Sequence, residues 1–238
     1  MSILLKHLKI TLCMKTYSAQ VIQKKWRNIY TTRNFNQYKS QILNVFNKHT
    51  DEVNNMFIKC LKIYQKYPPA KNEYKFIFGG LVQLAFIDLL GKVFHKCLDL
   101  DELHDFGSEY KNDCCLYITP CVKFNISIKA KSKTTGNVIL INKHGNNVVH
   151  NLKNLITFVV ILETRQIIII NHNDIPIEYI KDNEANISYK GSLITFIKKN
   201  KPELVYTLNP NEMFKIFIEE EYNEIVPINL YKELYNKL

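Results

Sequence analysis

The residues best placed to do chemistry lie in a stretch of alternating polar and apolar side chains that ends at Lys131. Successive side chains on a β-strand point to opposite faces, so we expect Ser127, Lys129 and Lys131 to share one face. Asp113 begins an earlier strand, and a short turn at Pro120 separates the two strands. If they pair antiparallel, Asp113 lies beside Lys129, and a carboxylate meets an ammonium group.

A carboxylate beside a lysine is a pair that metal-assisted hydrolysis of a phosphodiester can use. Asp113 would hold a hard divalent ion such as Mg²⁺, and Lys129 would orient the attacking water or stabilise charge on the phosphate. The alternative is structural. Lys129 and Lys131 are then the solvated face of an amphipathic strand, and Asp113 caps a turn. The sequence alone leaves both interpretations open.

The order of the elements around this pair resembles the PD-(D/E)XK nuclease superfamily, over roughly residues 73 to 171. A long helix is followed by the strand with Asp113, the strand with Ser127-Ile128-Lys129, a further strand, and then another helix and strand. The resemblance implies a restriction-endonuclease-like αβββαβ core and a Mg²⁺-dependent DNA endonuclease. It also implies catalytic roles for Asp113, Ser127, Lys129 and Gln83, with Asp113 as the metal ligand.

Two of these positions depart from or only approximate the family pattern. Ser127 stands where the family usually has a second carboxylate, and a neutral hydroxyl is a poorer ligand for Mg²⁺. Gln83 is matched to a Glu or Gln that family members present from the preceding helix. The departure at Ser127 leaves open a nuclease-fold protein that binds DNA without cutting it.

The charge of the chain predicts a polyanionic partner. Its 32 Lys+Arg against 22 Asp+Glu give a net charge of +10, which would concentrate phosphates near the protein. Nucleic acid, and DNA in the first place, is the expected partner, contacted by Lys131, Lys133 and Lys190. An AT-rich genome is the alternative source of the charge, because Lys, Asn and Ile are all abundant. That composition is compatible with a virus-encoded protein.

A second basic segment covers residues 18–35. It resembles the IQ motif that binds calmodulin-like proteins, with Ile22 and Arg27 in place and Asn28 instead of the usual glycine. A basic amphipathic helix carrying the single Trp of the chain could dock into an EF-hand groove. It could equally lie along DNA through Lys24 and Arg27, or pack on the domain and leave its charges in water.

Cysteine usage and hydropathy predict an intracellular protein, cytoplasmic or nuclear. The six cysteines show no paired CxxC spacing, and the N-terminal apolar run is interrupted by Lys6 and Lys9. The apolar run from residue 155 to 170 is cut by Glu163 and Arg165, so we expect no membrane span.

The pattern of apolar residues predicts an α/β protein with a mixed central β-sheet flanked by helices. Pro68-Pro69 ends the first helical pattern, which divides the chain into an N-terminal helical segment, residues 1–69, and an α/β core, residues 70–238. A fully apolar helix is expected over residues 73–97. Strands are expected over residues 116–119, 123–131, 138–143, 156–163 and 166–171, and a helix or strand over 192–199.

Overall fold

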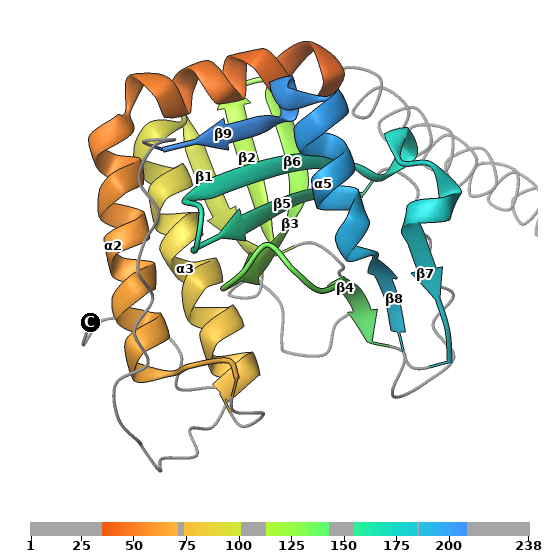
Figure 1. The fold of residues 1–238 in the computed structure, drawn as a ribbon. Helices are drawn as coiled ribbons and strands as arrows, with labels where there is room; N and C mark the ends of the chain where they lie inside the picture. The colour runs from red at the N-terminus through yellow and green to blue at the C-terminus, as the bar shows by residue number, and fades with distance from the viewer. Residues whose placement is uncertain (1–34, 71–73, 101–112, 143–154, 185, 209–238) are drawn as a thin grey trace, which may run out of the picture. The chain divides into compact units, whose positions relative to one another are not determined.

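The computed structural model describes residues 35–70, 74–100, 113–142, 155–184 and 186–208 (Figure 1). The chain divides into two compact units, residues 1–38 and residues 39–238, and the second holds the sheets and helices described below. Pro68 and Pro69 follow the end of helix α2 at Lys66, as the sequence predicts, but the residues on both sides of them belong to this second unit.

A mixed sheet of six strands forms the centre of this unit (Figure 1). Its strands pair in the order β1-β2-β3-β5-β6-β9. Only β3 and β5 run parallel; the other neighbours are antiparallel. The strands are β1 (Lys96–Asp99), β2 (Cys114–Thr119), β3 (Val122–Lys131), β5 (Ile156–Ile161), β6 (Gln166–Asn171) and β9 (Val205–Thr207). The expected α/β class with a mixed sheet is therefore confirmed.

A second, antiparallel sheet of three strands lies beside the first. It has the order β4-β8-β7 and contains β4 (Val138–Asn142), β8 (Asn186–Tyr189) and β7 (Ile180–Asp182). The third strand of the expected αβββαβ core, β4, thus leaves the central sheet instead of extending it. Val138 and Leu140 of β4 pack into the same apolar cluster as Val159 and Ile161 of β5. Burial of this apolar face holds the two sheets together.

One face of the six-stranded sheet is covered by helices from the first half of the unit. Residues 39–48 are helical, and α2 (Thr50–Lys66) and α3 (Lys75–Val93) follow. The apolar side chains of α2 recur at helical spacing and are buried: Val53, Met56, Phe57, Cys60, Ile63 and Tyr64. Aromatic rings join the helices to the sheet, because Phe86 of α3 contacts both Phe46 and Phe158 of β5.

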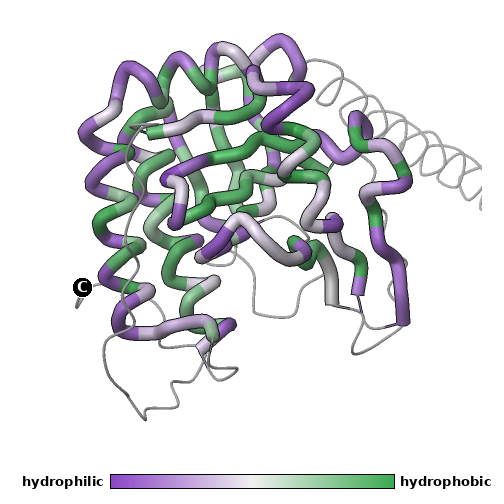
Figure 2. The backbone as a smooth tube through the Cα atoms, in the orientation of Figure 1, coloured by the Kyte–Doolittle hydropathy of each residue, from purple (hydrophilic) through white to green (hydrophobic). Residues whose placement is uncertain are grey.

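Helix α3 is the core helix that the sequence predicts, and its hydrophobic residues stand out in Figure 2. Among the described residues it alone is long and apolar enough to cross a membrane by length and composition, yet 56% of its most apolar window is buried inside the protein. Burial against α2 and the sheet explains why its apolar residues surround the whole helix.

The opposite face of the six-stranded sheet packs against α5 (Gly191–Asn200) and the second sheet. Val159, Ile161, Ile168 and Ile170 of β5 and β6 meet Leu193 and other apolar residues of α5 there. All six residues of β5 are buried, so the continuous apolar run is explained by cover on both faces, as expected.

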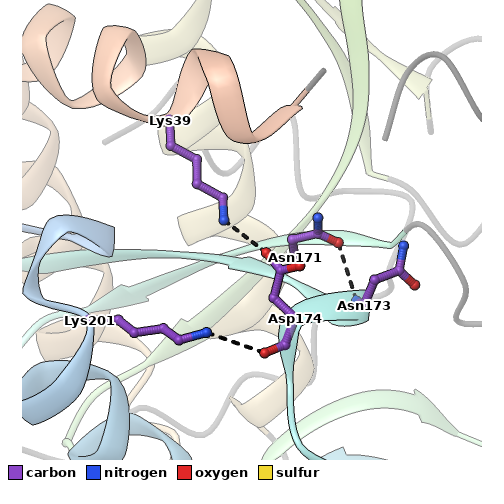
Figure 3. A network of polar contacts seen from close by, with 5 residues as sticks. All are labelled: Lys39, Asn171, Asn173, Asp174 and Lys201. Atoms are coloured by element: carbon purple, nitrogen blue, oxygen red, sulfur yellow. Dashed lines mark hydrogen bonds and ion pairs between the residues drawn. The ribbon is translucent and has the colours of Figure 1, made fainter. Parts of the chain in front are cut away.

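A polar network after β6 connects distant segments of the unit (Figure 3). The ammonium of Lys39 lies 3.0 Å from the Asp174 carboxylate. Lys201, beyond α5, donates to the backbone carbonyl of Asp174 at 3.4 Å. The Asn171 side chain accepts from the backbone N–H of Asn173 at 3.2 Å. Asp174 therefore connects Lys39 and Lys201, which lie in segments far apart in the sequence.

Candidate nucleic-acid site

The pairing of β2 with β3 places Asp113 beside Ser127. Cys114 lies opposite Ile126, and the backbone N–H of Asp113 donates to the Ile126 carbonyl at 2.8 Å. Because β2 begins at Cys114, the next amide of β3 has no ladder partner from that strand. The Asp113 carboxylate takes this role: its Oδ2 accepts from the backbone N–H of Ile128 and, at 3.1 Å, from the Ser127 hydroxyl.

Lys129 completes the pair that the sequence predicts. Its Nζ lies 4.0 Å from Asp113 Oδ2, and the two side chains are 25% and 16% exposed respectively. Partial burial strengthens the attraction relative to a pair in open water. The structure therefore brings Asp113, Ser127 and Lys129 together, through the antiparallel register inferred from the short turn at Pro120.

The polar face of β3 is less open than a solvated strand face. Ser127 is 1% exposed and Lys131 is 9% exposed, whereas Lys133 in the following loop is exposed. The solvated-face alternative therefore does not describe Ser127 or Lys131. The capping alternative does describe part of the role of Asp113, since its carboxylate satisfies two donors of β3.

Gln83 lies on α3, across the sheet from the polar face of β3. Ile128 pairs with Phe158, whose ring contacts Phe86 of α3. Residues 128 and 129 point to opposite faces, so Lys129 and Ser127 face away from α3. Gln83 is half-buried, and its catalytic role stays a prediction.

Lys131, Lys133 and Lys190 are brought to one pair of neighbouring loops. Val138 of β4 pairs with Tyr189 of β8, so the loop of residues 132–137 meets the start of α5. The backbone N–H of Gly191 donates to the Asn137 side chain at 3.2 Å. Lys133 and Lys190 are exposed here, and the buried Lys131 ammonium donates to the Gly136 carbonyl.

The remaining predicted nucleic-acid contacts, Lys24 and Arg27, lie outside the described residues, as does the whole IQ-like segment. The calmodulin-like partner therefore stays a prediction. A peptide covering residues 18–35 and captured on calmodulin in calcium but not in EDTA would support it.

The described residues do not supply the usual ligand set for Mg²⁺. Among them, no group of three or more His, Cys, Asp or Glu side chains could hold a metal ion. One oxygen of Asp113 already accepts two hydrogen bonds, and its neighbours are a hydroxyl and an ammonium. Mg²⁺ is usually bound by one or two carboxylates, with waters and substrate phosphates completing its octahedron, so Asp113 alone would be at the lower limit of such a site.

Sequence reasoning assigned no role at this site to Thr157, which lies next to Ser127 on β5. Thr157 is fully buried, and its hydroxyl has no hydrogen-bond partner among the described residues. It lies near the Tyr189 hydroxyl without reaching hydrogen-bond geometry: burial raises the pKa of Tyr189, and the nearby Thr157 hydroxyl opposes this. The sequence feature that could have identified Thr157 is its place as a threonine within the run of isoleucine, phenylalanine and valine of β5.

His172 and Tyr189 form a second polar pair on this side of the sheet. His172 Nδ1 lies 3.0 Å from the Tyr189 hydroxyl, and their rings stack with centroids 5.7 Å apart. Burial lowers the pKa of His172 below its ordinary value of 6.5, because the charged imidazolium is desolvated.

This pKa shift predicts a loss of stability in mild acid. Below pH 6.5 the unfolded chain protonates His172 before the folded chain does, so the free energy of unfolding falls as the pH falls through this window. The contribution of this residue is at most about 1.4 kcal/mol per pH unit. Urea unfolding between pH 7.5 and 5.5 should show a shallower pH dependence in His172→Gln than in the natural sequence. Equal slopes in the two proteins would contradict the attribution of this pH dependence to His172.

No protein-family model, curated protein or solved structure matches the chain. The features of this chain that bear on function are therefore the Asp113–Lys129 pair and the lysines at the end of β3.

Proposed function

We propose that this protein binds nucleic acid, and DNA in the first place, through the loops that adjoin the end of β3 and through the partly exposed Lys129. The observation that carries the proposal is the gathering of Lys131, Lys133 and Lys190 at one pair of loops. Among the described residues none of the three forms an ion pair with a carboxylate. Together with the net charge of +10, these lysines make a surface suited to phosphates.

Lys129 extends this surface along the strand. It shares a face with Lys131, two residues away, which places their backbone positions about 6.6 Å apart at the usual rise of a strand. Asp113 neutralises part of the Lys129 charge and fixes its position. The lysines at the end of β3 would therefore contribute most of the affinity, and Asp113 with Lys129 would lie at one border of the bound strand.

A second candidate is hydrolysis of the bound phosphodiester by a PD-(D/E)XK-type site. The contact between Asp113 and Lys129 at 4.0 Å favours it. Asp113 would be the metal ligand, and Lys129 and Ser127 would act beside it. Against it stand the single carboxylate and the absence, in the described part of the chain, of a metal-binding group. We therefore place binding before cleavage.

Binding and cleavage are separated by one pair of measurements. Fluorescence anisotropy with duplex and single-stranded DNA should show binding that weakens steeply with salt and does not change when EDTA is added. Supercoiled plasmid incubated with the protein in Mg²⁺ or Mn²⁺ should remain intact. Metal-dependent nicking that disappears in both Asp113→Asn and Lys129→Ala would instead establish the hydrolytic site. Failure to bind either DNA at low salt would remove the proposed function.

A further inference from the structure

Lys131 carries a buried positive charge that the described part of the protein does not neutralise. Its side chain is 9% exposed, and its ammonium donates to a single neutral acceptor, the Gly136 carbonyl. Burial lowers the pKa of this ammonium, because desolvation disfavours the charged form. A buried cation is ordinarily paired, so the missing partner requires an explanation.

Lys39 of the same unit shows the usual arrangement, because its ammonium lies 3.0 Å from the Asp174 carboxylate (Figure 3). The carboxylate attached to the loop that follows β3 is that of Glu163, and it accepts from the backbone N–H of Thr134 at 3.1 Å and from the Thr134 hydroxyl at 3.3 Å. Glu163 thus anchors the loop without pairing with Lys131.

The backbone at Gly136, whose carbonyl accepts from the Lys131 ammonium, is open on one side. Gly136 is exposed and has φ = 84°, and a Cβ built there would meet Lys131 Nζ at 3.9 Å. Apart from the two chain neighbours of Gly136, no other described heavy atom lies within 4 Å of that Cβ position. On the other side the backbones close up, since a Cβ on Gly191 would lie 3.0 Å from the Gly136 carbonyl oxygen.

Several groups around this opening suit an anion. Lys133 and Lys190 are exposed on the two loops, and Gly191 and Ser192 begin α5. The positive end of the α5 dipole adds to the field of the three ammonium groups. The buried Lys131 ammonium remains the deciding feature, because no carboxylate in the described part of the chain forms an ion pair with it.

We propose that Lys131, the loop of residues 132–137 and the first residues of α5 form a phosphate-binding site. The site would take one phosphate of the nucleic-acid backbone while Lys129 faces the next part of the same strand. The assignment of the phosphate to nucleic acid rests on the proposed function. The binding of a phosphate group itself does not.

Pyrophosphate tests the site without nucleic acid. The chain has seven glycines, so ¹⁵N-glycine labelling gives seven amide signals, and Gly80, Gly91, Gly136 and Gly191 each follow a residue type that precedes no other glycine, which assigns them. Pyrophosphate should shift the signals of Gly136 and Gly191 in a saturable way, while Gly80 and Gly91 of α3 remain still. A titration with sodium chloride at matched ionic strength controls for salt. Uniform or unsaturable shifts would overturn the site.

Lys131→Met is the decisive variant, because it keeps the apolar stem and removes only the charge. We expect the pyrophosphate affinity to fall at least about tenfold and the DNA affinity several-fold, with a salt slope shallower by about one unit. Lys123→Met is the matched control: Lys123 is an exposed lysine near the other end of β3. Unfolding in urea confirms that both variants are folded.

The outcomes separate this site from the proposed function. Pyrophosphate binding that requires Lys131, with no DNA binding, would preserve the phosphate site and overturn the nucleic-acid proposal. DNA binding that is unchanged in Lys131→Met, with no pyrophosphate effect at Gly136, would preserve the nucleic-acid proposal and overturn the phosphate site.

Discussion

Replacing Asp113 with alanine is expected to lower the free energy of unfolding by about 2–4 kcal/mol. The carboxylate accepts from the Ile128 amide and from the Ser127 hydroxyl, and Ser127 is 1% exposed. Alanine would leave both donors without a partner in a region that water reaches poorly, and would leave the partly buried Lys129 unpaired. Urea unfolding, compared at its midpoint with an unchanged m value, measures the loss.

A double variant shows whether the orphaned hydroxyl is the cause. Ser127→Ala in the Asp113→Ala background removes the donor that has lost its acceptor, so the double variant should be more stable than Asp113→Ala alone, by roughly 1 kcal/mol. Asp113→Asn should cost less than Asp113→Ala, since its amide oxygen still accepts a hydrogen bond. A loss below about 0.5 kcal/mol in Asp113→Ala would mean that the carboxylate does not hold the start of β2 to β3.

The largest functional effect is expected from removing the lysines at the end of β3 together. A variant with Gln at Lys129, Lys131, Lys133 and Lys190 should bind DNA on the order of 100-fold more weakly at low salt, because up to four phosphate contacts are lost. Equilibrium anisotropy with one labelled duplex measures the affinity. Because Lys133 and Lys190 are exposed and Gln is polar, the change in stability should come mainly from the partly buried Lys129 and the buried Lys131.

The control for this variant removes the same charge elsewhere. Four exposed lysines on other elements are replaced by Gln: Lys48, Lys62, Lys96 and Lys199. Both variants lose four positive charges, so any effect of net charge alone is equal in the two. Equal losses of affinity would mean that the whole basic protein, and not this surface, attracts DNA.

The sequence predicted the central geometry of the site because that geometry is local. The alternation of residues 123–131 fixes which side chains share a face, and the short turn at Pro120 leaves an antiparallel hairpin as the simplest pairing. Asp113 therefore meets Ser127 and Lys129 as expected. The bounds of β6 also follow directly from its apolar run.

The sequence did not predict which strands pair across long distances. Residues 138–143 have the pattern of a strand, but nothing in the pattern says that β4 pairs with β8 in a second sheet. β7, β8 and β9 have three or four residues each, too few to show a period. β1 was also missed, because the helix expected over residues 73–97 overlaps its first two residues, whereas α3 ends at Val93.

The burial of Lys131 was missed for the same reason. Alternation on β3 indicates that Lys131 shares a face with Lys129, but the cover on that face comes from the β4–β8 sheet and α5. Only the fold shows that the ammonium reaches the Gly136 carbonyl beside the first residues of α5. A pattern within one strand identifies a face, whereas the environment of that face depends on distant segments.

The salt dependence of DNA binding tests the central claim most directly. The slope of log Kobs against log salt counts the phosphates that the protein contacts, independently of the absolute affinity. For duplex DNA, the variant at Lys129, Lys131, Lys133 and Lys190 should show a slope shallower than the natural sequence by about 3 to 4 units, and the control variant should keep the natural slope. Natural slopes in both variants would contradict the claim that DNA contacts these four lysines.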